Sequence, residues 1–295
     1  MKPPAFAYHA PDTLGAALAA LAEAGDGGKV LAGGQSLVPL LNMRLAAPAE
    51  LVDINRITAL DTLEVTAGGV RVGALARHSR VERSDAAAGV QPLLRRALEN
   101  VAHPVIRNRG TVVGSLAHAD PAAELPAVLA LLDGTVEVRS ATGRRTVPAG
   151  AFFTGPLESA LLPGELAVSA FFPALPPRTG TAFRELSRRH GDYALAGVAV
   201  TVGLDEDLRV ATARAGYLGV AATPVVLDLT GPALAAQEGR PAGECDWAEV
   251  GGYAAARLDP EPDIHASAEY RRTLAGVLTE RALRAAAAEG GRSDS

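Results

Sequence analysis

Apolar positions near the start of the chain follow helical and strand spacings in turn. Leucines recur at helical spacing over residues 12–21, a stretch that begins with the capping residue types Asp and Thr. The short apolar runs at residues 30–31 and 51–54 favour buried strands, and residues 36–45 between them favour a helix with leucines along one side. A strand, a helix and a strand within so few residues predict a βαβ unit with parallel strands.

The next part of the chain also mixes both spacings. Residues 70–74 alternate as a strand does, and residues 80–100 are predicted to be largely helical. Gly110 and Gly114 bracket a short piece that we expect to be extended, and a further helix is predicted from Ala122 onward. The second unit of the chain is therefore also expected to combine helices with strands.

The last part of the chain shows mainly strand patterns followed by one helix. Residues 135–147 predict a hairpin, and the Pro-rich segment 173–180 predicts a linker or domain edge. Residues 194–204 and 208–218 alternate on either side of a polar turn, which predicts an antiparallel hairpin. A C-terminal helix is predicted over residues 267–289, and its Tyr and Arg at positions 270 and 271 are expected to provide packing and surface charge.

Composition narrows the possible functions. Hydrophobic residues make up 48% of the 295 positions and charged residues 21%, which is typical of globular proteins with two or three compact units. The formal net charge of -5 disfavours nucleic acid or an anionic membrane surface as the main partner. The single cysteine, Cys245, excludes an internal disulfide, a multi-cysteine zinc site and an iron–sulfur cluster held by this chain alone.

Targeting and membrane signals are not recognisable in the sequence. Lys2-Pro3-Pro4 is followed by no long apolar core, so the N-terminus does not resemble a secretory signal. The most apolar windows, such as residues 125–132, are too short to span a bilayer. We therefore expect a cytoplasmic protein without a membrane span.

A loop of small residues follows the first predicted buried strand. It consists of Ala32, Gly33, Gly34, Gln35, Ser36 and Leu37. Glycines let bare backbone N–H groups approach an anion, and the start of the following helix adds a field that favours negative charge. A plain strand-to-helix turn is the alternative interpretation, because Gly-Gly turns are common. The loop matches neither a P-loop nor a dinucleotide fingerprint.

A second loop has a similar character. Thr111, Gly114 and Ser115 offer a hydroxyl, small residues and backbone donors just before a predicted helix, with Arg107 and Arg109 nearby. Two such loops in neighbouring units are suited to holding the two halves of one diphosphate. The histidines are too scattered for a metal site, and no nucleophile–base or acid–base pair is recognisable, so we expect no catalytic or metal-binding residues.

Residues 32–57 and 106–134 together resemble the FAD-binding medium subunit of the molybdenum hydroxylases, a family that includes aerobic carbon monoxide dehydrogenase and xanthine dehydrogenase. The resemblance continues through residues 188–200 and 264–283 and covers nearly the whole chain. It therefore depends on several separate motifs that occur in the expected order.

The resemblance implies an α+β fold. Residues 1–175 would form an FAD-binding domain of the PCMH type from two α/β subdomains, at about residues 1–57 and 58–175. Residues 176–295 would form a C-terminal domain of the CO dehydrogenase flavoprotein type, with an antiparallel sheet and helices.

The resemblance also implies which side chains and loops contact FAD. The first loop would wrap the pyrophosphate, the second loop would complete its site, and later residues would lie near the ribityl chain and the isoalloxazine. The implied cofactor-binding residues are Ala32, Gly33, Gly34, Gln35, Ser36, Leu37, Thr111, Gly114, Ser115, His118, Asp120, Glu124 and Tyr193. For Tyr193, a role as an ordinary core aromatic is an equal alternative.

One position departs from the family pattern. Val113 stands where the family usually has the first of two paired glycines. A β-branched residue does not easily adopt the backbone angles that are open to glycine. We expect an ordinary extended conformation at this position, the alternative being an altered contact with FAD.

The implied function is electron transfer. A small subunit with [2Fe–2S] clusters would pass electrons from a large molybdenum-cofactor subunit to FAD in this chain, in a dimer of heterotrimers. The flavin would then reduce an external acceptor such as a quinone, oxygen or NAD. Carbon monoxide, an N-heterocycle or an aldehyde remain open as substrates. Two other functions also remain open: a self-sufficient FAD-dependent oxidase, and a scaffold subunit that has lost its flavin.

Overall fold

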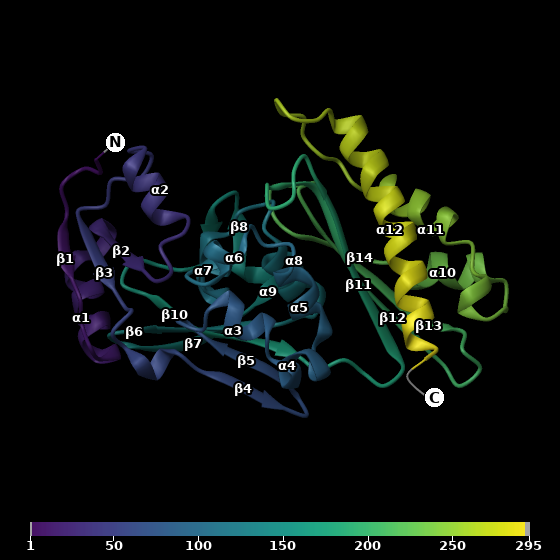
Figure 1. Ribbon diagram of the computed structural model, residues 1–295, viewed down its shortest axis with the longest axis horizontal. Helices are drawn as coiled ribbons and strands as arrows, with labels where there is room; N and C mark the ends of the chain where they lie inside the picture. The colour runs from purple at the N-terminus through teal and green to yellow at the C-terminus, as the bar shows by residue number, and fades with distance from the viewer. Residues whose placement is uncertain (1, 293–295) are drawn as a thin grey trace.

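A small parallel sheet holds the N-terminal end of the chain in this computed structural model, which describes residues 2–292 (Figure 1). Its strands, in spatial order, are β1 (Ala7–His9), β3 (Glu50–Asp53) and β2 (Gly28–Leu31). The helices α1 (Leu14–Ala24) and α2 (Leu37–Asn42) belong to the same unit. Because β2 and β3 pair in parallel on either side of α2 in the sequence, the predicted βαβ unit is confirmed.

The helix α2 is shorter than the predicted helix over residues 36–45, so that prediction is wrong at its C-terminal end. Arg44 has a φ of 59°, and the Leu45 amide donates to the carbonyl of Leu40 at 2.9 Å. A left-handed residue with this hydrogen bond ends a helix. Leu45 is 72% exposed as a result, and of the leucines on the predicted apolar side only Leu41 is buried.

The second sheet is antiparallel and has five strands. In spatial order they are β4 (Leu63–Thr66), β5 (Gly69–Gly73), β10 (Leu166–Pro173), β6 (Thr135–Ser140) and β7 (Gly143–Pro148). The pairing of β6 with β7 confirms the predicted hairpin, and β5 confirms the predicted strand at residues 70–74. The central strand β10 arrives from later in the chain and was not predicted, because it is apolar on both faces and shows no alternation.

Three short helices replace the largely continuous helix that residues 80–100 predict. They are α3 (His78–Glu82), α4 (Asp85–Val90) and α5 (Pro92–Leu98). The hydroxyl of Ser84 accepts from the Ala87 amide and starts α4, and Pro92 is the first residue of α5. A serine cap and a proline in the first turn are both typical of helix starts. Each of them therefore begins a new helix here instead of continuing the previous one.

Short elements connect the larger ones. They are α6 (Pro104–Arg107), α7 (Val112–His118), α8 (Glu124–Leu131), α9 (Ala149–Phe152), β8 (Phe153–Gly155), β9 (Glu158–Ser159) and the 3-10 turns Gly25–Gly27, Thr58–Leu60 and Ala242–Glu244. β8 pairs with β9, and Leu157 between them donates its amide to the carbonyl of Ala119 at 3.0 Å. This contact ties the small hairpin to the end of α7.

The third sheet is antiparallel and has helices on both faces. Its strands are β11 (Thr179–Ser187), β12 (Ala194–Leu204), β13 (Val210–Leu218) and β14 (Val225–Asp228). One face packs on α8, and the other is covered by α10 (Thr230–Gln237), α11 (Trp247–Ala255) and α12 (Ala268–Gly290) (Figure 1). The predicted hairpin at residues 194–218 and the predicted C-terminal helix are confirmed.

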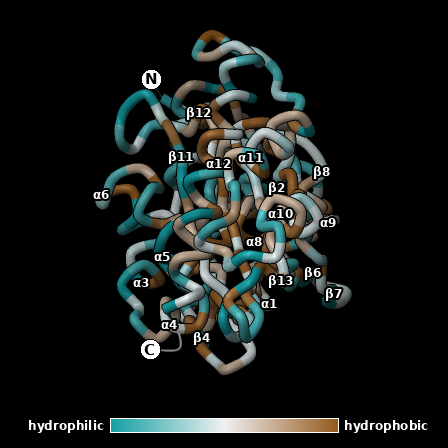
Figure 2. Tube along the Cα trace, turned by 90° about the vertical axis from the view of Figure 1, so that its right-hand side faces the viewer, coloured by the Kyte–Doolittle hydropathy of each residue, from teal (hydrophilic) through white to brown (hydrophobic). Residues whose placement is uncertain are grey.

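Two apolar cores hold these layers together. The first surrounds α8, whose residues Leu125–Leu131 are all buried, and the second lies between the third sheet and the C-terminal helices. Hydrophobic stretches accordingly lie inside, around α8, and hydrophilic ones follow the outer loops (Figure 2). Because Phe183 of β11 joins the first core and Ala182 joins the second, the third sheet is shared by both.

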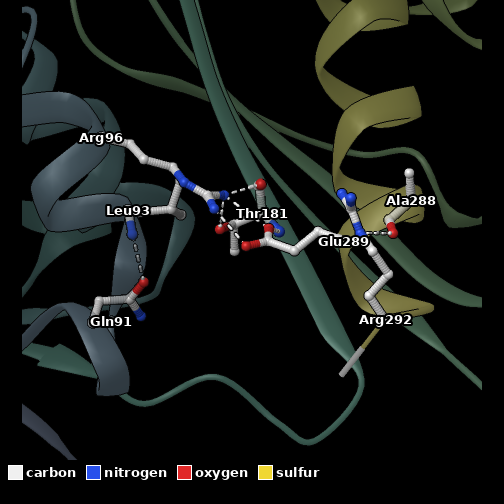
Figure 3. Close-up of polar contacts among 7 residues, drawn as sticks. All are labelled: Gln91, Leu93, Arg96, Thr181, Ala288, Glu289 and Arg292. Atoms are coloured by element: carbon white, nitrogen blue, oxygen red, sulfur yellow. Dashed lines mark hydrogen bonds and ion pairs between the residues drawn. The ribbon is translucent and has the colours of Figure 1, made fainter. Parts of the chain in front are cut away.

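A polar contact crosses from α5 to the end of α12 beside these cores (Figure 3). The Arg96 guanidinium donates to both carboxylate oxygens of Glu289 and to the carbonyl and hydroxyl of Thr181. The Thr181 amide also donates to Glu289, at 2.8 Å. Burial alone would raise the pKa of Glu289. The hydrogen bonds from Arg96 and Thr181 outweigh this effect, so the pKa of Glu289 is lowered. One ion pair and its hydrogen bonds to Thr181 thus join α5, β11 and α12, which are distant from one another in the sequence.

Replacing Arg96 with leucine should destabilise the chain by about 2 kcal/mol, because Glu289 would keep its half-buried charge without the guanidinium. The matched control is Arg95→Leu on the same helix, whose partner Asp85 has a side chain that is 97% exposed. That change should cost less than about 1 kcal/mol. Denaturant unfolding of the purified chain measures both, and equal effects would contradict a structural role for the Arg96–Glu289 pair.

Candidate functional site

The first glycine loop leaves a row of backbone donors without partners. It runs from the end of β2 to the start of α2, and Gly34 takes a φ of 73° that glycine adopts without strain. The carbonyl of Gly34 accepts from the Val38 amide at 3.0 Å. Within residues 2–292, the amides of residues 33–37 donate to no acceptor. Since α2 has only six residues, these amides rather than a helix dipole are the main attraction for an anion.

Gly33 brings this loop into direct contact with the second one. A Cβ built on Gly33 would collide with the carbonyl of Arg109 and lie 2.9 Å from the Cα of Gly110. No side chain fits there, so the two backbones approach as closely as glycine allows. Two loops that are far apart in the sequence therefore meet at one place.

The side chains of Asn55 and Arg77 form hydrogen bonds with the backbone of both loops. Asn55 donates from Nδ2 to the carbonyl of Ala32 at 2.8 Å and accepts from Arg77 at 2.7 Å. Arg77 donates its other terminal nitrogen to the carbonyl of Arg109 at 2.6 Å. Asp53, at the end of β3, accepts from the amide and the side chain of Asn55. Neither Asn55 nor Arg77 was predicted from the sequence, because their partners are distant in the chain.

The second loop is helical where it was expected to be extended, so the prediction for the piece between Gly110 and Gly114 is wrong. Residues 112–118 form α7, and Thr111 is its N-cap, with its hydroxyl accepting from the Gly114 amide at 3.1 Å. This cap starts a helix directly after Thr111. Ser115 continues the turn by donating its amide to the carbonyl of Thr111.

Val113 lies within this helix, so the extended conformation expected for it is also wrong. It is 2% exposed, it belongs to the first apolar core, and its φ is negative. A helical backbone is open to valine, which loses only side-chain freedom there. The departure from the family pattern therefore causes no backbone strain.

The end of α7 carries the next group of predicted residues. Ala119 ends the helix with a φ of 52°, and the loop after it places Asp120 Oδ2 4.0 Å from His118 Nε2. Asp120 Oδ1 accepts from the Ala122 amide at 2.9 Å. Burial lowers the pKa of His118, and the charge of Asp120 only partly offsets this effect. His118 is thus a neutral hydrogen-bonding group at pH 7.

Glu124 and Tyr193 lie close to Asp120. Burial, followed by the charge of Asp120, raises the pKa of Glu124 to about 7. The pKa of Tyr193 is also raised, by burial and then by the charges of Asp120 and Glu124. Tyr193 is nevertheless 69% exposed, so the alternative of a core aromatic is wrong. A third carboxyl, Glu185 on β11, interacts electrostatically with Glu124 and was not predicted.

The structure therefore divides the predicted site residues into two groups. Residues 32–37 contact Arg109 and Gly110 through Gly33, directly before residues 111–115. His118, Asp120, Glu124 and Tyr193 follow beyond α7, toward the third sheet. The helices α7 and α8 lie between the N-terminal and C-terminal sheets, so the second group lies where both halves of the chain meet (Figure 1).

Arg271 of α12 is a buried guanidinium, so the expectation of a surface charge at this position is wrong. It is 6% exposed, pairs with Asp263 at 2.7 Å, and donates to the carbonyls of Leu195 and Gly219. Leu195 lies at the start of β12, two residues after Tyr193, and Gly219 directly follows β13, so both carbonyls lie at one end of the third sheet. Arg271 therefore fixes this end of the sheet, a role that the helical pattern alone does not indicate.

Comparison with known families assigns the class of protein. Residues 4–175 match the family described as the FAD binding domain in molybdopterin dehydrogenase. Residues 181–286 match the CO dehydrogenase flavoprotein C-terminal domain. Fold and paired loops thus define a flavoprotein with an N-terminal FAD-binding domain and a C-terminal domain of antiparallel sheet and helices.

Individual proteins match over almost the full length. The chain is 43% identical to the 6-hydroxypseudooxynicotine dehydrogenase complex subunit alpha of Paenarthrobacter nicotinovorans, with 96% of this chain and 95% of that protein covered. It resembles quinoline 2-oxidoreductase from Pseudomonas putida 86 with a TM-score of 0.89 and 36% identity, covering 98% and 99% of the two chains. For carbon monoxide dehydrogenase from Hydrogenophaga pseudoflava the TM-score is 0.87 at 35% identity, with the same coverage.

The chain belongs to the FAD-binding medium subunits of the molybdenum hydroxylases, the carbon monoxide dehydrogenase-like family. It is an oxidoreductase subunit of a multi-subunit complex. Across residues 2–292, no helix has both the length and the apolar character needed to cross a bilayer.

His78 supports the second loop from inside the protein. Its ring is buried, a Cβ on Gly110 would lie 2.9 Å from its Nδ1, and within residues 2–292 neither ring nitrogen has a hydrogen-bond partner. Burial lowers the pKa of this ring to about 4. The neutral ring packs against Gly110 and so supports the second loop from beneath.

Acid should destabilise the chain through His78. Between pH 6.5 and pH 4 the unfolded histidine binds a proton that the folded ring does not, so stability falls by about 3 kcal/mol as the pH drops through this window. His78→Leu should remove that part of the acid sensitivity, whereas His265→Leu at an exposed position should keep it. Denaturant unfolding at pH 7 and pH 4 tests this, and an unchanged pH dependence in His78→Leu would contradict it.

Proposed function

We propose that the loops of residues 32–37 and 111–115 hold the diphosphate of one FAD, through which this subunit transfers electrons. The contact of Gly33 with the backbone of Arg109 and Gly110 carries this assignment, because it brings both loops to a single site. A diphosphate is an acceptor for several N–H groups at once, and the amides of residues 33–37 have no acceptor elsewhere in residues 2–292.

The polar side chains behind the loops favour an anion as the ligand. Asn55 and Arg77 engage the carbonyls of Ala32 and Arg109. These oxygens carry partial negative charge and would repel a phosphate if they were left free. With the carbonyls engaged, the amides of the first loop are the groups that remain for the diphosphate, and the Arg77 guanidinium adds a positive charge behind them.

The second group of residues fits the flavin end of the same cofactor. FAD, when bound, supplies the two-electron and one-electron chemistry that no side chain of this chain provides. Asp120 and Glu124 would hydrogen-bond the polar ribityl and ring edges, with Glu124 able to donate or accept because its pKa is about 7. The exposed ring of Tyr193 would cover the isoalloxazine and exclude water from it.

The partners that we propose are a large molybdenum-cofactor subunit and a small subunit with [2Fe–2S] clusters, assembled as a dimer of heterotrimers. Cluster ligands must come from another chain, because Cys245 is the single cysteine and is buried. Electrons would pass from the clusters to the flavin and then to an external acceptor. The large subunit would select the substrate.

The alternatives that the sequence left open lose their support. The flavin-free scaffold depended on Val113, whose ordinary helical conformation leaves the second loop intact. A self-sufficient oxidase would need a substrate-binding acid–base pair beside the flavin. Glu124 and Glu185 both have raised pKa values, of about 7 and about 8, so this pair does not separate an acid from a base.

Gly33→Ala should weaken FAD binding by about tenfold or more. The new methyl group meets backbone atoms of Arg109 and Gly110 that cannot rotate away, so the loops must separate. Gly15→Ala in α1 is the matched control, because a Cβ at Gly15 meets nothing within 4 Å. Visible absorbance after adding FAD and desalting measures retained flavin, together with denaturant unfolding to check folding.

Stoichiometric flavin in the wild type and Gly15→Ala, with loss in a folded Gly33→Ala, would support the two-loop site. Absence of flavin from the wild type, even after co-expression with partner subunits, would overturn the FAD assignment. Full retention in Gly33→Ala would leave FAD in place but refute the contact between the loops as its basis.

The electron-transfer role predicts dependence on partners. The isolated chain with FAD should not have its flavin reduced by a small oxidisable substrate, because it lacks the molybdenum and iron–sulfur groups. Co-expressed with a large and a small subunit of this family from the same organism, it should co-purify with them, and substrate should then bleach the flavin absorbance. Anaerobic bleaching of the isolated chain by substrate would instead support the self-sufficient oxidase.

A further inference from the structure

A polar cavity of about 570 Å³ lies between the N-terminal and C-terminal halves, beside the Arg96–Glu289 pair (Figure 3). It is bounded by α5, by β11 and by the end of α12. The residues of its lining that matter here are Arg96, Thr181, Arg184, Glu185, Glu289 and Arg292. The cavity therefore leads from the surface between the halves to Glu185.

Glu185 is an unusual member of this lining. Its Oε2 is buried and has no hydrogen-bond partner within residues 2–292. Its Cβ packs against Gly197 of β12, where an added Cβ would lie 3.0 Å away. A buried carboxylate oxygen without a donor is costly, whereas a protonated carboxyl avoids most of that cost.

The charged groups around Glu185 do not neutralise it. Those facing it or lining the same space are Asp120, Glu124, Arg96, Glu99, Arg184, Glu289 and Arg292. Arg96 already pairs with Glu289. Arg184 is exposed and directly precedes Glu185 on β11, so the Arg184 side chain points to the opposite face of the strand. The interaction that Glu185 has with Glu124 is repulsive when both are ionised.

Burial and this repulsion shift both carboxyls in the same direction. Burial, followed by the charge of Glu124, raises the pKa of Glu185 to about 8. Glu124 has its pKa raised to about 7 by burial and by Asp120. Because the two groups interact, their protons belong to the pair, and at pH 7 the pair holds at least one of them.

We propose that Glu185 stores a proton at the domain interface and exchanges it through Glu124 with the flavin site, using the cavity as the route to solvent. This inference rests on the proposed function, because it needs the flavin beside Glu124. The geometry that supports it is the carboxyl of Glu185, whose side chain lines a polar cavity, whose Oε2 is buried without a hydrogen-bond partner among residues 2–292, and which interacts electrostatically with Glu124 of the other half.

The proton balance is simple. Two-electron reduction of bound FAD would be balanced by uptake of one proton, which the carboxyl of Glu124 would supply. Glu185 passes its proton to the resulting carboxylate of Glu124, and water in the cavity reprotonates Glu185. Reoxidation by an acceptor that takes up electrons alone would release this proton through the same groups to solvent. Glu185 acts through Glu124 and is therefore a positioning residue for the proton.

Infrared titration of the chain without flavin tests the stored proton. The carbonyl stretch of a protonated carboxylic acid should persist at pH 7 and disappear as the pH rises through about 8. Glu185→Gln should lose the part of this signal that titrates near pH 8 and keep the part from Glu124 that titrates near pH 7, whereas the control Glu64→Gln, at an exposed position on β4, should keep both parts. If Glu185→Gln does not fold, Glu124→Gln should shift the remaining titration of Glu185 to lower pH. A carboxyl titration near pH 8 that survives in Glu185→Gln would overturn the proposal.

The flavin-loaded chain tests the exchange itself. The midpoint potential of the bound flavin, measured from pH 6 to pH 10, should change slope near pH 8 in the wild type and in Glu64→Gln. In Glu185→Gln that change of slope should be absent, an effect that a merely structural role would not produce. If the infrared signal behaves as expected but the potential profile is identical in Glu185→Gln, the exchange is refuted. Failure of the wild type to bind FAD would instead refute the proposed function and leave the infrared result standing.

Discussion

The close contact between Gly33 and the backbone at Arg109 and Gly110 is the constraint on which the rest of the site depends. It removes the space for any side chain and joins a parallel βαβ unit to the start of α7. Once the two backbones touch, the first loop lies next to the residues that directly precede α7. Asn55 and Arg77 then fix the separation of the loops by engaging a carbonyl from each.

Local features of the sequence were sufficient to predict most of the elements and the two loops. The βαβ unit, the hairpins and the C-terminal helix follow from spacing, and the loops follow from their glycines. The errors occurred where a single hydrogen bond decides the local structure. The Thr111 cap turned an expected extended piece into α7, and the left-handed Arg44 ended α2 early. Asn55, Arg77 and Glu185 escaped prediction because their contacts join segments that are distant in the chain.

The residues that we propose for the flavin end of the site come from both halves of the chain. Asp120 and Glu124 come from the segment between α7 and the first turn of α8, whereas Tyr193 and Glu185 come from the third sheet and the loop beside it. Arg271 holds the carbonyls of Leu195 and Gly219 and so fixes the end of that sheet. The pKa values of these carboxyls consequently depend on how closely the two halves of the chain approach each other.

The Arg96–Glu289 pair joins residues that are 193 positions apart in the sequence. Closing a loop of this length has a large entropic cost, and contacts of such long range tend to form late in folding. Glu289 also lies in the last turn of α12, so during synthesis its carboxylate leaves the ribosome only after the whole N-terminal half. The N-terminal half must therefore persist for a time without this partner, and the relative orientation of the halves becomes fixed only after α12 has been synthesised.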